Sequence, residues 1–130
     1  MYEAYFDLVL IDAPCSGEGM FRKESAAIEN WSLENVLACA KRQLEILNSA
    51  ANTVKKGGKL IYSTCTYAPE ENEQVIAKFL EEHSEFVICD IANKFGQNGI
   101  EKFAPNTKNI AKTRRIFNFD GGEGHFAARL

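Results

Sequence analysis

Two cysteines follow predicted strands closely enough for both thiols to do chemistry. Cys15 stands in the sequence DAPCSG, and Cys65 stands in the sequence STCTYAPEEN. A thiolate can attack an electrophilic carbon and hold it in a covalent intermediate, so covalent catalysis is one interpretation of the pair. A disulfide is a second interpretation, which a reducing cytoplasm disfavours. A metal site is a third, which the isolated positions of His83 and His125 in the sequence do not support.

The two thiols can meet only if the fold brings two distant strand ends together. The apolar run 6–12 predicts a central strand buried on both faces, and apolar residues at helical spacing predict a helix from Leu33 to about Val54. The basic pair at 55–56 followed by glycines at 57–58 is typical of a helix end. Further along, the pattern predicts strands at 59–65 and 85–90, a helix from near Pro69 to before Ser84, a long surface loop at 92–113, and a terminal hairpin built from 114–119 and 125–130.

This order of elements predicts an α/β fold. Strands that alternate with helices indicate right-handed crossovers and a mostly parallel sheet, to which the hairpin adds an antiparallel strand at or near one edge. Ligands of such open sheets bind beyond the carboxyl ends of the strands, which would bring Asp12, Cys15 and Cys65 to the same rim. Cys65 would also lie shortly before a helix, whose N-terminus can lower the pKa of a nearby thiol. Cys39 and Cys89 are interpreted as small buried residues.

The composition indicates one packed domain and excludes several classes of protein. The chain has 130 residues, of which 45% are hydrophobic, and a net charge of -3. That sign is opposite to the one expected of a basic nucleic-acid module, although the basic stretch 102–115 could track an RNA backbone or could be a solvated surface. No apolar stretch approaches the length of about eighteen residues that a membrane helix needs, no signal peptide begins the chain, and no CxxC pair predicts zinc. We therefore expect a reduced, cytoplasmic protein and no metal.

Both cysteine motifs carry a resemblance to a known family. The sequence LIDAPCSGEGMFRK, followed by GGKLIYSTCTYAPEENEQVI, resembles the RNA cytosine-5 methyltransferases of the Sun (Fmu) type. The late sequence GEGHF resembles the closing motif of the bacterial ribosomal-RNA branch of that family. The resemblance implies the C-terminal half of a Rossmann-like domain that uses S-adenosylmethionine, with ribosomal RNA as the expected substrate.

The resemblance also implies a role for each thiol. Cys65 would add to carbon 6 of cytosine, which makes carbon 5 able to take a methyl group from S-adenosylmethionine. Cys15 would assist release of the methylated product, and Asp12 would contact the cytosine ring, although an Asp before a turn can also be a simple cap. Asp12, Ala13 and Pro14 would line the cofactor.

Further residues are expected to touch the RNA substrate. For Arg22 and Lys23, contact with RNA phosphates and exposure on a solvated loop remain equally open, and the role of His125 also remains open. The predicted substrate-binding residues are Pro14, Ser16, Gly17, Arg22, Lys23, Thr64, Thr66 and His125. The acidic residues at 70–73 are interpreted as matching the positive end of a helix dipole, with a partly structural role.

The family's main cofactor motifs do not occur in the sequence. A glycine-rich loop of the PGGK kind and the acidic residue after the second strand have no counterpart, and RIFNFDGG stands where relatives often carry Pro-His before the glycines. Residues 1–130 are therefore expected to be a single partial methyltransferase domain that begins at the fourth strand. We expect it to be inactive in isolation and to form a homodimer or bind a partner through an exposed sheet edge. The alternative is a non-catalytic, truncated remnant that dimerises or binds RNA.

Overall fold

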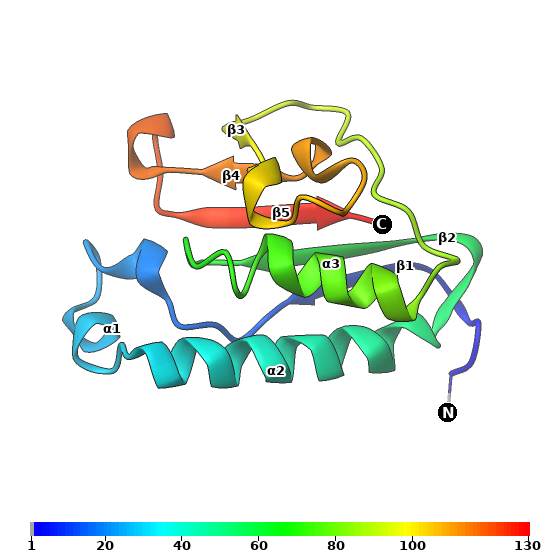
Figure 1. The fold of residues 1–130 in the computed structure, drawn as a ribbon, viewed down its shortest axis with the longest axis horizontal. Helices are drawn as coiled ribbons and strands as arrows, with labels where there is room; N and C mark the ends of the chain where they lie inside the picture. The colour runs from blue at the N-terminus through cyan, green and yellow to red at the C-terminus, as the bar shows by residue number, and fades with distance from the viewer. Residues whose placement is uncertain (1) are drawn as a thin grey trace.

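A five-stranded sheet organises residues 2–130, the part of the chain that the computed structural model describes (Figure 1). The strands lie in the order β1-β2-β5-β4-β3. Their bounds are Phe6–Asp12 for β1, Val54–Thr64 for β2, Gln97–Asn98 for β3, Arg114–Ile116 for β4 and His125–Arg129 for β5. Only the β1–β2 pair is parallel among these strands, and the other three pairs are antiparallel. The α/β class is confirmed, but the sheet is mixed rather than mostly parallel in this part of the chain.

Two helices cover one face of this sheet. They are α2, Leu33–Ala51, and α3, Glu73–Glu82, and a short helix α1, Ser25–Glu29, precedes them. Phe79 and Leu47 from the helices pack into one core with Leu60, Tyr62 and Phe126 from β2 and β5. Close packing in this core fixes the position of the strand ends relative to the helices. The prediction of two helices flanking β2 is confirmed, although α3 begins at Glu73 and not near Pro69.

The segment between α2 and β2 differs from its prediction. The helix ends at Ala51, and β2 begins at Val54, so the basic pair and the glycines at 55–58 belong to the strand. They form an irregularity in the β1–β2 ladder, because Phe6 pairs with Val54 while Leu8 pairs with Lys59. A glycine with positive φ at Gly57 suits such an irregularity as well as it suits a helix end. The local residue types therefore did not distinguish the two structures.

Strand β1 lies where it was predicted, but it is an edge strand. Leu8 and Leu10 are 58% and 68% exposed on the face that α2 and α3 do not cover, while Ile11 is buried in the core. The prediction of burial on both faces is therefore wrong for residues 2–130. Strand β1 has a neighbour on one side only among the described strands, and this agrees with the expectation of an open sheet edge. The exposed face of Leu8 and Leu10 lies on the same strand.

The predicted strand at 85–90 does not form. Only Cys89 pairs, in a single bridge with Arg129 at the end of β5. The neighbouring strand β4 pairs with β5 from His125 to Ala127, which leaves little of that edge free for the passing segment. The predicted terminal hairpin is confirmed by the antiparallel β4–β5 pair. The region 92–113 is more ordered than a surface loop, because it contains β3 and buries Ile110 and Thr113.

No helix among the described residues is long and apolar enough to span a membrane.

The fold places three segments that are distant in sequence at one end of the sheet. Figure 1 shows the loop after β1, the carboxyl end of β2 and the turn between β4 and β5 at the left-hand end of the molecule. The residues predicted to do chemistry, Asp12, Cys15 and Cys65, therefore lie at this end of the sheet. We call this end the thiol rim.

Candidate functional site

The thiol rim brings Cys15 and Cys65 into direct contact. Asp12 at the end of β1 is paired with Ser63 in β2, so the two loops that follow begin side by side. The Sγ atoms of Cys15 and Cys65 lie 3.1 Å apart, and the backbone N–H of Cys65 donates to Cys15 Sγ at 3.4 Å. Both cysteines are free thiols and partly buried. The predicted convergence of the two thiols is therefore present in the structure, over 50 residues of sequence.

This contact makes the two thiols chemically unequal. The hydrogen bond from Cys15 lowers the pKa of Cys65 to about 7, and this effect exceeds the opposing effects of burial and of the Asp12 charge. The same hydrogen bond, together with burial, raises the pKa of Cys15 far above its usual value. Near neutral pH the pair therefore consists of a thiolate-prone Cys65 and a protonated Cys15 that donates to it. The largest cause of the lowered pKa of Cys65 is this hydrogen bond and not the helix N-terminus that we expected to act on Cys65, and α3 begins only at Glu73.

The loop that carries Cys15 is held in place by the buried carboxylate of Glu71. Glu71 Oε1 accepts from the backbone N–H of Ser16 at 2.9 Å, and Glu71 Oε2 accepts from Ser16 Oγ at 2.5 Å. Gln43 from α2 donates to both Glu71 Oε1 and the carbonyl of Pro14, each at 2.9 Å. Burial raises the pKa of Glu71, while the hydrogen bonds from Ser16 and Gln43 oppose that rise. The residues on both sides of Cys15 are thus tied to the helices.

The loop that carries Cys65 is held in the same way. Thr64 Oγ1 donates to Asn72 Oδ1 at 2.6 Å, and Asn72 Nδ2 donates to the carbonyl of Thr66 at 2.9 Å. Thr66 Oγ1 also lies 2.9 Å from Ser16 Oγ, which joins the two loops beneath the thiols. Ser16, Thr64 and Thr66 are buried. The structure places these three predicted substrate residues in support of the loops, and direct contact with substrate remains a prediction for them.

The other predicted residues lie closer to solvent. Asp12, the last residue of β1, and Pro14 are exposed, with Ala13 buried between them. Asp12 Oδ1 accepts from Ser63 Oγ at 3.4 Å. Gly17 has a φ of 75°, a left-handed conformation that glycine adopts at little cost.

The remaining predicted residues extend the rim in two directions. Arg22 and Lys23 are exposed on the segment after the Cys15 loop. His125 is exposed at the start of β5, where it is paired with Ile116 and lines a separate pocket of about 320 Å³ with Phe95 and Asp120. These positions are compatible with a surface that contacts a large substrate around the two thiols.

A second buried glutamate, which sequence reasoning did not identify, ties the β4–β5 hairpin to the rim. Arg115 donates from Nε and Nη2 to the two carboxylate oxygens of Glu73, at 2.7 and 2.6 Å, and both side chains are almost fully buried. Arg115 also donates to the carbonyl of Tyr67 at 3.0 Å. The EENE sequence, which contains Glu73, was the one sequence feature that pointed to this residue. We interpreted it as matching the helix dipole, and that interpretation did not predict that Glu73 is buried.

Two glycines bring the hairpin turn against the Cys15 loop. The N–H of Gly19 donates to the carbonyl of Cys65 at 2.9 Å, and the N–H of Gly124 donates to the carbonyl of Gly19 at 3.1 Å. A Cβ atom on Gly19 would lie 2.3 Å from the carbonyl oxygen of Gly124, and one on Gly124 would lie 2.3 Å from Cζ of Tyr67. The close approach favours glycine at both positions, which accounts physically for the second glycine of the GEGHF sequence, Gly124.

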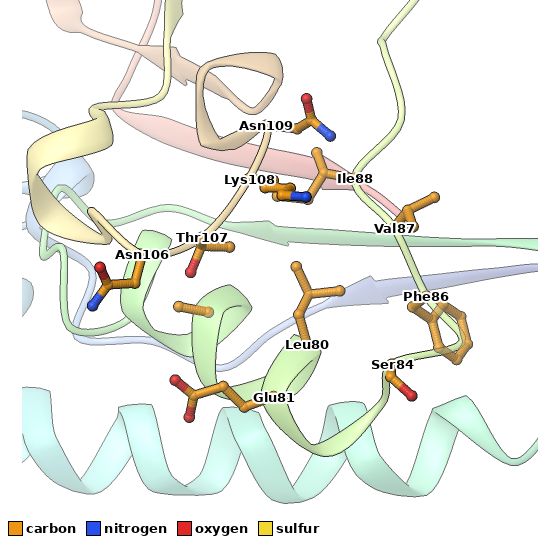
Figure 2. Close-up of a pocket in the computed structure, with 11 residues that line it drawn as sticks. Leu80, Glu81, Ser84, Phe86, Val87, Ile88, Asn106, Thr107, Lys108 and Asn109 are labelled. Atoms are coloured by element: carbon orange, nitrogen blue, oxygen red, sulfur yellow. The ribbon is translucent and has the colours of Figure 1, made fainter.

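A pocket elsewhere on the molecule has no connection to the thiols. Its volume is about 290 Å³, and it lies over the C-terminal half of α3 between Leu80, Phe86 and Thr107 (Figure 2). None of the predicted site residues lines it. Among residues 2–130, no group of three or more His, Cys, Asp or Glu side chains is placed to hold a metal ion. The chemistry of the described part of the chain is therefore centred on the thiol rim.

Comparison with known proteins agrees with this assignment. The family model described as 16S rRNA methyltransferase RsmB/F matches residues 1–130. Ribosomal RNA small subunit methyltransferase F of Aeromonas salmonicida (strain A449) is 38% identical over 125 residues, which is 96% of this chain and 25% of that protein. The protein of that name from Vibrio cholerae serotype O1 (strain M66-2) is 56% identical over 70 residues, which is 54% of this chain and 15% of the relative.

Solved structures give the same result for the fold. The crystal structure of PH0851 superposes with a TM-score of 0.85 and 30% identity, over 98% of this chain and 27% of that one. The crystal structure of NSun6 from Pyrococcus horikoshii with SFG has a TM-score of 0.75 and 27% identity, over 93% and 28% of the two chains. The present chain thus spans at most about a quarter of the length of these curated relatives. Its sequence and its Rossmann-like fold show that the chain belongs to the 16S rRNA methyltransferase RsmB/F family.

Proposed function

We propose that this chain supplies the two thiols and one wall of the base pocket of an RNA cytosine-5 methyltransferase that acts on ribosomal RNA in the cytoplasm. The observation that carries the proposal is the 3.1 Å contact between Cys15 and Cys65, which lowers the pKa of the Cys65 thiol and raises that of the Cys15 thiol. The names of the relatives supply ribosomal RNA as the substrate. The fine mechanism follows from the chemistry of the two sulfur atoms.

Cys65 is the nucleophile in this proposal. Its thiolate adds to carbon 6 of cytosine, forming an S–C bond and making carbon 5 electron-rich enough to accept a methyl group. A pKa of about 7 leaves a large fraction of Cys65 as thiolate at neutral pH. Asp12 is exposed at the end of β1 and close enough for its charge to act on Cys65, so we expect it to contact the cytosine ring.

Cys15 acts in the release step. Once solvent water has accepted the proton of carbon 5, the electrons of that C–H bond restore the C5–C6 double bond. The S–C bond to Cys65 then breaks, and its electron pair returns to the sulfur as a thiolate. The Cys15 thiol, which keeps its proton, donates a hydrogen bond to that departing sulfur at the distance already present in the structure. A charge-assisted hydrogen bond stabilises the leaving thiolate and so favours release of the methylated base.

Residues at the end of β1 fit one wall of a site for S-adenosylmethionine. Asp12 and Pro14 are exposed where ligands of open sheets bind, and the free edge of β1 leaves space beside them. When bound, S-adenosylmethionine supplies the electrophilic methyl group. A neighbour crystallised with SFG, an analogue of this cofactor, supports the assignment. Of residues 2–130, we assign only Asp12, Ala13 and Pro14 to this site, so we expect the chain by itself to be inactive.

Adduct formation tests the roles of the two thiols. In a chimera, residues 1–130 would replace the matching segment of the Aeromonas salmonicida relative, so that the remainder of that enzyme completes the cofactor site. With RNA and S-adenosylmethionine, Cys15→Ala is expected to accumulate a covalent RNA adduct on a denaturing gel, because release is slowed. Cys65→Ala is expected to form none. The reverse pattern would overturn the assignment of roles, and no adduct with either variant would favour the alternative of a non-catalytic remnant.

We further propose that the exposed face of β1 is an association surface. Leu8 and Leu10 are exposed on it, and the rings of Tyr2, Tyr5 and Phe6 cluster at its amino end with centroids 5.0–5.5 Å apart. An unpaired edge strand with exposed apolar side chains favours pairing with another chain. A second copy is the occupant that we expect when the chain is alone.

Light scattering on the isolated chain tests this association. We expect a dimer for the unmodified chain, and at least a tenfold weaker association for Leu10→Glu, because a charge would then be buried at the interface. Val87→Glu is the matched control, since Val87 is 63% exposed, close to the 68% of Leu10, but belongs to the segment after α3 and not to β1. A monodisperse monomer that binds no hydrophobic dye would contradict the proposal.

A further inference from the structure

Three aromatic rings form a parallel column beside the thiol rim. The ring centroids of Tyr67 and Phe117 lie 5.5 Å apart with an interplanar angle of 12°, and those of Phe117 and Phe119 lie 5.2 Å apart at 11°. Phe119 ends the column and is 75% exposed. Among the other aromatic pairs of the described residues, Phe79 and His83 stack at 27°, and the rest are tilted or edge-on, such as Tyr62 with Phe126 at 69°. The column therefore presents a flat ring face to solvent, backed by two further parallel rings.

The exposed ring is held on a structured turn. Asp120 Oδ2 accepts from the N–H of Phe117 at 2.9 Å, and the N–H of Asp120 donates back to the carbonyl of Phe117 at 2.9 Å. Phe119 lies within the 3₁₀ turn that these bonds close, Asn118–Asp120. Gln97 donates to the other oxygen of Asp120 at 3.0 Å. The backbone that carries Phe119 is therefore held before any ligand binds, and its ring rests on that of Phe117, which lowers the entropy cost of stacking on it.

The column is connected to the nucleophile through the backbone. Tyr67 follows Cys65 by two residues, and its ring packs against Gly124 of the hairpin turn. Gly124 is hydrogen-bonded to Gly19, and Gly19 to the carbonyl of Cys65. Figure 1 shows the turn between β4 and β5 at the same end of the molecule as the carboxyl end of β2. The turn that carries Phe119 thus lies at the same end of the molecule as the thiols.

This geometry fits a nucleobase. Carbon 6 of cytosine is accessible to a thiolate only when the base has left its stack, and this leaves the face of the neighbouring base without its partner. Unpaired bases in RNA are commonly bound by stacking on aromatic side chains, which accept any base because each has a flat π-face. We propose that Phe119, backed by Phe117 and Tyr67, binds an unpaired base next to the target cytosine. This inference rests on the proposed function, since it takes single-stranded RNA as the substrate of the rim.

Fluorescence of a base analogue tests the stack on the 130-residue chain. The probe is a seven-nucleotide single-stranded RNA with one central cytosine and 2-aminopurine on its 5′ or its 3′ side. Stacking is expected to quench 2-aminopurine when the chain binds, and Phe119→Ala is expected to remove the quenching and weaken binding about tenfold. Phe119→Trp, which keeps a flat ring, is expected to retain both. Val87→Ala is the control, because Val87 is 63% exposed but has no ring and lies in the segment after α3.

Each other outcome overturns the proposal. RNA that binds without quenching, or with quenching that survives in Phe119→Ala, would show that no base stacks on Phe119. The absence of any RNA binding by the chain would do the same. These failures are distinguishable from failure of the proposed function, because the adduct on Cys65 is read on a denaturing gel and does not depend on Phe119. An adduct together with an unquenched probe would support the methyltransferase proposal and overturn only the proposal that a base stacks on Phe119.

Discussion

Replacing Glu73 with alanine is expected to lower the free energy of unfolding of this chain by about 3–5 kcal/mol. The change leaves the guanidinium of Arg115, whose side chain is 3% exposed, without its carboxylate partner. The backbone N–H of Ile100 loses its acceptor as well. An unpaired buried charge costs far more than the pair contributes, because neither water nor another anion replaces the partner. Urea unfolding followed by circular dichroism measures the loss.

Two controls separate this effect from a general loss of ion pairing. Asp90→Ala breaks the pair with Lys112, which is 3.2 Å long but largely solvated, and is expected to cost less than about 1 kcal/mol. The double change Glu73→Leu with Arg115→Met removes both buried charges and is expected to recover most of the lost stability. A loss below about 1 kcal/mol in Glu73→Ala would contradict the view that this pair holds the hairpin to α3.

The sequence predicted those parts of the fold that depend on short-range patterns. The apolar run of β1, the start of α2 at Leu33 and the terminal hairpin were all predicted, because periodicity and turn residues act within a few positions. The meeting of Cys15 and Cys65 was predicted from one long-range rule, that parallel strands end at the same rim. The prediction of a strand at 85–90 was wrong, because an apolar run indicates burial but not whether a sheet edge is free to pair with it.

The two buried glutamates could not be found in the same way. Glu71 and Glu73 stand near the start of a helix, where an acidic side chain already has a sufficient local explanation in the helix dipole. Their burial depends on partners 55 and 42 residues away, Ser16 and Arg115, which no local pattern connects to them. Charged residues are seldom buried unless paired, so the prediction required knowledge of the tertiary fold. These positions are where the structure adds most to the understanding of the site.

Replacing Glu71 with alanine is expected to raise the pKa of Cys65 from about 7 toward its usual value near 9. The change releases the loop around Cys15 by removing the acceptor of Ser16, so the hydrogen bond from Cys15 is lost. That bond is the largest influence on Cys65, whereas the Glu71 charge, which acts in the opposite direction, is the smallest of those resolved. The stability cost is about 1–3 kcal/mol, because Ser16 N–H is left unpaired while Gln43 keeps the carbonyl of Pro14.

The rate of alkylation of Cys65 by iodoacetamide, followed peptide by peptide with mass spectrometry, measures this shift. Since the thiolate is the reactive form, the rate rises as the pH passes through the pKa, with a midpoint near pH 7 in the unmodified chain and a higher one in Glu71→Ala. Glu71→Gln is the matched control: it keeps an acceptor for Ser16 and Gln43 but removes the charge, so its midpoint should stay near 7 or fall slightly. Cys15→Ala should raise the midpoint as Glu71→Ala does. Equal midpoints in Glu71→Ala and Glu71→Gln would mean that the carboxylate acts on Cys65 only through its charge, and that the Cys15 loop keeps its position without it.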